Sequence, residues 1–229
     1  MAFRFNTYGT CRAPGCNKSL RTNGGAVYCY SHASIDIRYG DPRQKRITRR
    51  ELHRPLRAVA RLRKRNAHAD WHLMEENWHA LVRQCSDIAN SRDADLRYRR
   101  QAANIIVQIA ESLEAARVVD TIAACFILEG EDVHNGHRRF VTDLAFRCCL
   151  LHALRRDAKA GRVFHVGGRD CRSHASYRVL HKRTRDTACD LIIEHMAVVG
   201  GFIARAELKH QEAQAAHKSA LMETLTSLI

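Results

Sequence analysis

The chain has 229 residues, 45% of them hydrophobic, so it can bury a substantial core without help from disulfides. Its nine cysteines are an odd number, which excludes a fully paired disulfide framework and is typical of a reducing compartment. The formal net charge of +14 lies almost entirely in residues 1–66, which carry 16 Lys and Arg against three acidic residues, whereas the other 163 residues carry 22 against 21. This separation favours a polyanionic partner, with nucleic acid ahead of an anionic membrane.

The first element in chain order is a group of four potential metal ligands with the spacing C-x4-C-x12-C-x2-H. They are Cys11, Cys16, Cys29 and His32. Three thiolates and one imidazole complete a tetrahedral shell, so the array predicts one structural Zn²⁺ with no open position for a catalytic water. The alternative is that these cysteines are incidental core or surface thiols.

Local turn signals predict how this array folds. Pro14 and Gly15 lead into Cys16 and predict a tight turn that brings the first two thiolates to one metal. An Asn-Gly pair at 23–24 predicts a β-hairpin between residues 19–22 and 26–29, and a short helix is expected from His32 to near Gly40. Knuckle, hairpin and helix together describe a treble-clef-like module. Fewer than 45 residues bury little apolar surface, so metal binding is expected to supply most of the folding free energy of this module, on the order of 10 kcal/mol.

The stretch from Cys11 to Pro42 resembles the short zinc modules of bacteriophage and mobile-element proteins, including HNH-type endonucleases. The resemblance rests on the C-x4-C pair, on the segment YCYSH at 28–32 and on the segment YGDP at 39–42, and it covers under a fifth of the chain. It implies a role that involves DNA. The nuclease itself needs a ββα-metal motif with paired histidines and an asparagine, and the remaining 187 residues do not contain that motif.

A basic segment follows the module. Thr48 and Glu51 have the spacing of a capping box, so a helix is expected to begin there, although Pro55 either kinks it or marks the first turn of a helix that begins at residue 55. Apolar residues recur at helical spacing, and a stripe of cations is offset from them. Arg outnumbers Lys thirteen to three in residues 1–66, and the guanidinium group matches phosphate oxygens and guanine edges better than an ammonium does.

We therefore expect an Arg-rich helix that contacts nucleic acid. The predicted contact residues are Arg46, Arg49, Arg50, Arg54, Arg57, Arg61 and Lys64. A solvated charged face, or a docking site for an acidic protein, is the alternative interpretation of the same residues.

From Trp71 onward the apolar pattern is helical almost throughout. The predicted helices cover residues 71–88, 96–119, 121–128, 140–158, 176–199 and 202–229, and Gly200 and Gly201 either separate the last two or are absorbed in one long helix. Residues 163–166 have the pattern of a short strand, but a single strand cannot make a sheet. The fold class is predicted to be mostly α, with a zinc module at 1–46, a basic helical arm at 47–66 and a bundle of about six helices at 67–229. The last helix is suited to homodimerisation.

Two further clusters contain metal-ligand residue types. One is placed in a Gly-containing loop and consists of Glu129, Glu131, Asp132, His134 and His137; the other consists of His165, Cys171, His174 and His181. The first would suit a divalent cation for phosphodiester hydrolysis, but both clusters are also compatible with ordinary solvated loops. The vicinal pair Cys148 and Cys149 lies in an apolar stripe and is expected to pack in the core.

These patterns together predict a non-enzymatic, zinc-stabilised DNA-binding regulator of a phage or mobile element, with RNA as the alternative polymer. A metal-dependent nuclease related to HNH-type endonucleases, and a protein-interaction module that redirects or inhibits a host machine, are the other two hypotheses. The longest apolar run, from Thr121 to Leu128, is too short to cross a bilayer, and the first residues lack the apolar core of a secretory signal. The expected location is therefore the cytoplasm, at the nucleoid in a bacterial cell, with no membrane partner.

Overall fold

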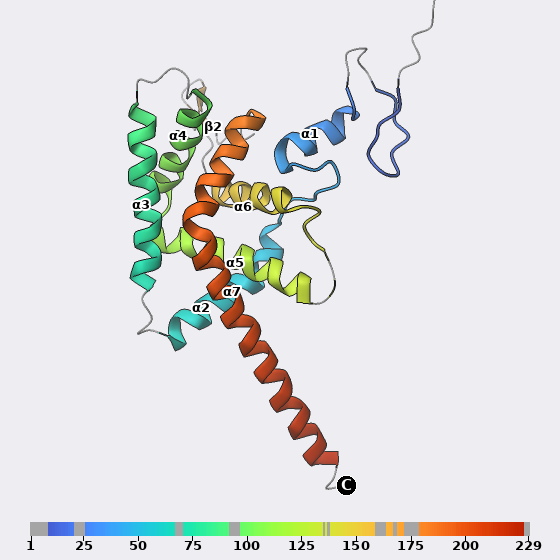
Figure 1. The fold of residues 1–229 in the computed structure, drawn as a ribbon, viewed down its shortest axis with the longest axis vertical. Coiled ribbons are helices and arrows are strands. Elements are labelled where there is room, and N and C mark those ends of the chain that lie inside the picture. The colour runs from blue at the N-terminus through green and yellow to red at the C-terminus, as the bar shows by residue number, and fades with distance from the viewer. Residues whose placement is uncertain are drawn as a thin grey trace, which may run out of the picture.

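The structure is a computed structural model that describes residues 9–20, 26–66, 71–91, 97–134, 136, 138–158, 164–166, 169–171 and 179–226. Within these residues it contains seven helices and one two-stranded antiparallel sheet, so the predicted mostly α fold class is confirmed (Figure 1). The elements are α1 (Tyr30–Tyr39), α2 (Arg49–Arg65), α3 (Trp71–Asn90), α4 (Arg97–Ser112), α5 (Ala115–His134), α6 (Asp143–Asp157), β1 (Phe164–Val166), β2 (Arg169–Cys171) and α7 (Lys182–Thr226).

The helical body differs from the predicted set of six helices in two places. The helix expected at 96–119 ends at Ser112, and a new helix begins at Ala115 and absorbs the one expected at 121–128. Neither residue 113 nor residue 114 is a glycine or proline, so no helix-breaking residue indicates an end at that position. The two helices expected at 176–199 and 202–229 form the single helix α7, which passes through Gly200 and Gly201 without a break.

Gly200 explains why a glycine pair lies inside a helix. A Cβ atom added at Gly200 would be 2.2 Å from Cδ2 of Phe126, so the ring of Phe126 lies directly against the backbone of α7. A glycine here therefore permits close packing of α5 on α7 and does not end the helix. Figure 1 shows these two helices crossing at the centre of the molecule.

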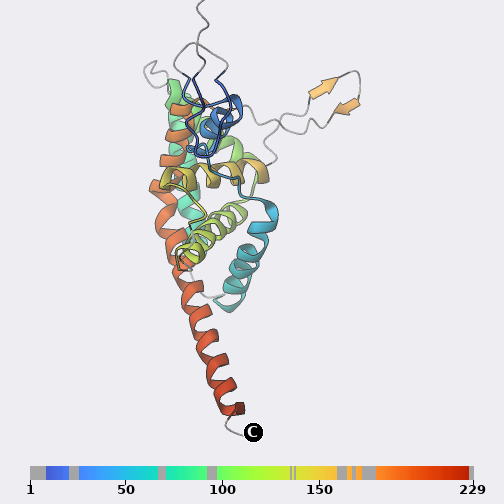
Figure 2. The ribbon, with the colours of Figure 1, turned by 90° about the vertical axis from the view of Figure 1, so that its right-hand side faces the viewer.

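The helix α2 begins as its capping box predicts. The backbone N–H of Glu51 donates to the Thr48 hydroxyl at 3.2 Å, and the backbone N–H of Thr48 donates to the Glu51 carboxylate at 2.7 Å. Pro55 lies inside the helix and is buried, so it does not mark the first turn. The apolar face of α2, which includes Leu52 and Val59, joins the main core, and Figure 2 shows α2 on the side of α5 opposite to α7. The Arg-rich helix is thus one wall of the helical body.

The core of this body is built around α5 and α7. Side chains of α5 such as Val119 and Ile122 are fully buried, and Ile192 and Met196 of α7 are equally inaccessible. Trp78 of α3 completes the core from the outer side, where α3 and α4 pack side by side. Burial of this many large aliphatic side chains supplies the main stabilisation, at about 25 cal/mol per Å² of apolar surface.

The segment between α1 and α2 is fastened to the start of α6. Arg139 donates from Nε to a Glu51 carboxylate oxygen at 2.8 Å and from its two terminal nitrogens to the carbonyl oxygens of Lys45 and Arg46. The Gln44 side chain accepts a hydrogen bond from the backbone N–H of Val141 at 3.1 Å. These contacts position the N-terminal module against the body.

The predicted short strand at 163–166 has a partner that the sequence did not indicate. Phe164–Val166 pairs with Arg169–Cys171 in an antiparallel register that places His165 opposite Asp170. The strand at 163–166 was predicted, but its partner at 169–171 was not, because a three-residue strand has too little periodic pattern to be recognised.

One described helix is long and apolar enough to pass a membrane-span test by length and composition. An 18-residue window of α7, between Lys182 and Thr224, has a mean hydropathy of 1.5. Half of it is buried inside the molecule, as in the core helix of a soluble protein. The sequence predicted that residues 121–128 are the best apolar run; the window in α7 is longer, and half of it is buried.

Candidate metal centre and basic surface

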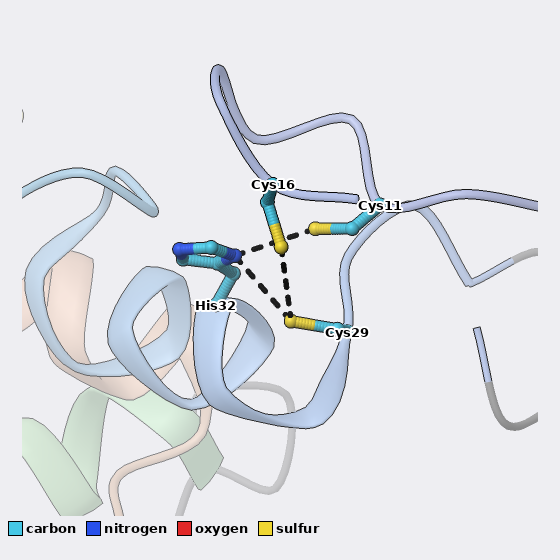
Figure 3. A group of neighbouring side chains, drawn as sticks. All are labelled: Cys11, Cys16, Cys29 and His32. Carbon is cyan, nitrogen blue, oxygen red and sulfur yellow. Dashed lines mark hydrogen bonds between the residues drawn. The ribbon is translucent and has the colours of Figure 1, made fainter. Parts of the chain in front are cut away.

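The four predicted ligand residues lie together at one point of the N-terminal module (Figure 3). Their ligand atoms, three Sγ and one histidine nitrogen, are all within 4.8 Å of one another. His32 Nδ1 is 3.3 Å from Cys11 Sγ and 3.4 Å from Cys29 Sγ, and the Sγ atoms of Cys16 and Cys29 are 4.0 Å apart. Around a tetrahedral Zn²⁺, neighbouring sulfur and nitrogen ligands lie about 3.5–3.8 Å apart, so these distances fit one four-coordinate ion. A sulfur separation of 4.0 Å excludes a disulfide, which requires about 2.05 Å.

Two local structures present the ligands. The backbone N–H of Cys16 donates to the carbonyl of Ala13 at 3.0 Å across Pro14 and Gly15, and Gly15 has φ of 74°, which confirms the predicted tight turn. Cys29 is the N-cap of α1, and His32 lies in its first turn, so the third and fourth ligands come from one helix start.

The second half of the module differs from the predicted hairpin. No strand occurs at described residues 19–20 or 26–29, and residues 21–25, with the Asn-Gly pair, lie outside the described part of the chain. The segment that pairs is upstream: Thr10 and Ser19 form an antiparallel bridge, and the backbone N–H of Arg12 donates to the carbonyl of Val27 at 3.1 Å. The ligand loop between Cys11 and Cys16 is therefore closed by its own flanking residues.

The surroundings of Cys11 favour the thiolate that a metal requires. Burial opposes ionisation of Cys11, but backbone N–H groups of Cys29 and Ala13 and the side chains of His32 and Cys29 outweigh it and lower the pKa to about 6. The pKa of Cys16 is raised: a backbone N–H of Lys18 lowers it, but burial and the neighbouring Cys11 and Cys29 thiols together outweigh that effect. A cation bound by these thiolates would offset the electrostatic repulsion between them.

The predicted nucleic-acid residues divide into two groups. Arg54 lies 3.5 Å from a Glu131 carboxylate oxygen, and Arg61 lies 3.1 Å from a carboxylate oxygen of the buried Glu207. These two arginines thus have partners in the molecule itself. Arg63, which belongs to the same helix, is bonded to Asp120 at 2.7 Å.

The other five predicted residues are exposed and make no ion pair with any residue of the described chain. They are Arg46, Arg49, Arg50, Arg57 and Lys64. Four of them lie in the first three turns of α2 or just before it. Arg138 and Arg139 line the same hollow as Lys45 and Arg46, and Arg117 and Arg156 line a neighbouring one with Arg49. Carboxylates line both hollows as well: Glu51 pairs with Arg139, and Asp157 pairs with Arg117 and Arg156. Sequence reasoning missed these later arginines because only the fold brings them beside α2.

The first of the two further clusters is not a loop. Glu129, Glu131 and His134 lie in the last turns of α5, because that helix continues to residue 134 through Gly130. Glu131 accepts a hydrogen bond from Gln211 in addition to its contact with Arg54. The side chain of Asp132 and the whole of His137 lie outside the described residues.

The second cluster falls mostly outside the described part of the chain. His165 and Cys171 belong to β1 and β2, whose side chains are not described, and His174 lies among residues 172–178, which are not described either. His181 is exposed just before α7. Cys148 and Cys149 are buried, as predicted.

No protein-family profile, no characterised protein and no solved structure matches this chain.

Proposed function

We propose that this protein is a zinc-stabilised DNA-binding regulator of a phage or mobile element that acts in the cytoplasm. The observation that carries the proposal is the division of the arginine stripe: Arg54 and Arg61 have carboxylate partners in the body, whereas the exposed Arg49, Arg50 and Arg57 form no ion pair with any described residue. Cations without internal partners are available to phosphate oxygens.

The metal centre supports this function indirectly. A complete shell of three thiolates and one histidine is suited to a structural Zn²⁺ ion rather than to catalysis. The module leads through residues 40–48 into the N-terminal end of α2, so it lies next in the chain to the segment that carries Lys45 and Arg46. In the zinc modules that residues 11–42 resemble, DNA is the usual partner.

The nuclease hypothesis has weaker support. Burial raises the pKa of Glu129 to about 7, with the nearby Asp143 adding to the effect. Glu131 is engaged by Arg54 and Gln211. The described residues contain no group of metal ligands besides the Cys11, Cys16, Cys29 and His32 cluster.

A gel-shift titration over a series of salt concentrations tests the proposal. Wild-type protein should bind duplex DNA with an affinity that falls steeply as salt rises. The variant Arg49→Gln, Arg50→Gln, Arg57→Gln removes three phosphate contacts and should reduce the slope of log affinity against log salt by up to about three, at about 0.9 per contact.

The matched control is the variant Arg83→Gln, Arg205→Gln, which removes exposed cations of α3 and α7 that have no ion pair within the described chain. Its salt slope should equal that of the wild type. A salt-independent affinity, or an equal loss in both variants, would contradict binding through α2. Single-stranded RNA of the same length, added as competitor, distinguishes the alternative polymer.

A further inference from the structure

A cavity of about 360 Å³ lies between the zinc-binding module and the helical body, at the junction of α1, α6 and the segment that leads into α7. This volume is within the range of about 300–1,000 Å³ that is usual for small-molecule sites. Five arginines and no carboxylate are among the described residues that line it. The arginines are Arg38, Arg46, Arg155, Arg156 and Arg185.

Two of the five arginines are fixed by the fold. Arg185 is buried and donates from Nη1 to the carbonyl oxygens of Asp36 and Ile37 at the C-terminal end of α1, while Nε and Nη2 contact Asp186. Arg156 donates from Nη1 to the carbonyl of Ile47 at 2.7 Å. These bonds hold the guanidinium groups in place at the wall of the cavity, so little side-chain entropy is lost when a ligand binds.

Two others have no bond within the described chain. Arg38, in the last turn of α1, and Arg46 are exposed at the cavity and make no hydrogen bond or ion pair through their side chains with described residues. Their guanidinium forks are free to close on an anion, and such forks match the oxygen spacing of phosphate.

The charge of this wall acts on the one histidine that lines the cavity. Burial of His152, together with the nearby Arg156, Arg155, Arg38 and Arg46, lowers the pKa of its imidazole to about 4. The ring packs edge-to-face on Tyr39 at 5.3 Å between centroids. The apolar residues that line the cavity are Ile37, Leu151, Val179 and Leu180.

We propose that this arginine cavity binds the phosphate group of a small organic phosphate, with the organic part against the apolar wall. An anion bound here contacts side chains of the module and of the body at once, and it therefore strengthens their association. The same phosphate chemistry is present at the 5′ end of a nucleic acid strand, and the test separates these two sources.

Isothermal titration calorimetry with inorganic phosphate, adenosine 5′-monophosphate and adenosine tests the proposal directly. Both phosphate-bearing probes should bind and adenosine should not. The variant Arg38→Gln, Arg46→Gln should weaken phosphate binding at least about tenfold, because each hydrogen bond to a charged group contributes enough for that ratio. The control Arg83→Gln, Arg205→Gln changes two exposed arginines of α3 and α7 that do not line the cavity and should leave phosphate affinity unchanged.

Nuclear magnetic resonance of His152 gives a second readout that remains valid if a variant is unstable. In wild-type protein, added phosphate should offset the arginine charge and raise the pKa of His152 from about 4. No calorimetric binding and no change at His152 with either phosphate probe would overturn the proposal, as would equal losses in the two variants.

A comparison of 5′-phosphorylated and 5′-hydroxyl oligonucleotides identifies the source. If the phosphorylated strand binds more tightly, and the Arg38→Gln, Arg46→Gln variant loses that difference, the cavity binds strand ends. If the two strands bind wild-type protein equally, the cavity binds free organic phosphates. Either result supports an anion site. The gel shift that tests DNA binding through α2 uses blunt duplex DNA with 5′-hydroxyl ends. Its outcome is therefore independent of whether the arginine cavity binds phosphate.

Discussion

At the scale of single residues, the four candidate metal ligands could be predicted from the sequence, but the ion pairs of the arginines could not. Cys11, Cys16, Cys29 and His32 meet because turn chemistry at Gly15 and a helix start at Cys29 bring them together within 21 residues of chain. Arg61 has its carboxylate partner 146 residues further along, at Glu207. Local sequence contains no signal for such a pair, because long-range ion pairs depend on how the helices pack.

Glu129 provides a prediction at this scale. Burial, with Asp143 nearby, raises its folded-state pKa from the usual 4.5 to about 7. Folding therefore takes up a proton between these values, so the contribution of this carboxyl to stability is complete below about pH 4.5 and is lost as pH rises through 7. The substitution Glu129→Gln should remove this pH-dependent loss of stability, because glutamine does not ionise. Because the side chain is only partly buried, we expect the variant to gain about 1–2 kcal/mol over wild type between pH 5 and pH 8.

Chemical denaturation at several pH values measures the effect of Glu129→Gln. The control Glu111→Gln alters an exposed carboxylate of α4 and should give a difference from wild type that does not change with pH. A constant difference for Glu129→Gln as well would show that this carboxyl is ionised throughout the range.

At the scale of elements, helix starts with capping chemistry were predicted well and helix ends without it were not. Thr48 and Glu51 placed the start of α2 correctly, and Gly40 placed the end of α1, where it has φ of 77°. The break at 113–114 has no such residue, and the glycines at 200–201 are inside a helix. A glycine can end a helix or can allow another helix to pack closely against it, and the sequence around the glycine does not distinguish the two.

The adjacent glycines of α7 allow a matched test of this distinction. Gly200→Ala places a methyl group 2.2 Å from the Phe126 ring and should destabilise the protein by about 1–3 kcal/mol or more through overpacking. Gly201→Ala meets nothing within 4 Å and should stabilise by about 0.5–1 kcal/mol through helix propensity. Denaturant melts of the two variants measure both values. Stabilisation by Gly200→Ala would show that α5 and α7 do not approach so closely.

At the scale of the whole molecule, the sequence predicted a mostly α fold with a metal-dependent N-terminal module. It did not predict that the basic arm packs into the same core as the other helices. The arm at 47–66 was expected as a separate unit, and the boundaries at 46 and 66 remain predictions. Leu52 and Val59 nevertheless share one core with Trp78 and Ile122, because an amphipathic helix with a strong apolar face packs wherever a complementary face is available. The module keeps a small cluster of its own, made of Cys11, Ala13, Leu20 and Cys29.

These two clusters predict how the molecule responds to metal removal. A chelator should unfold the knuckle and the first turn of α1, residues 9–32, because little besides the metal holds their small apolar cluster. The body should stay folded, and the end of α1 should stay docked, because Arg185 bonds its last carbonyls and Gly40 packs on Leu144. Hydrogen exchange resolved by residue should therefore show lost protection at 9–32 alone.

Cysteine variants separate the metal effect from general destabilisation. Cys16→Ser should lower the zinc content well below one ion per chain and reproduce the exchange pattern of the chelated protein. Cys85→Ser, in the buried core, should lower the melting temperature while keeping one zinc ion per chain. Retained protection at 9–32 in chelated wild-type protein would contradict the prediction and would mean that the module is held by its docking on α6 and α7.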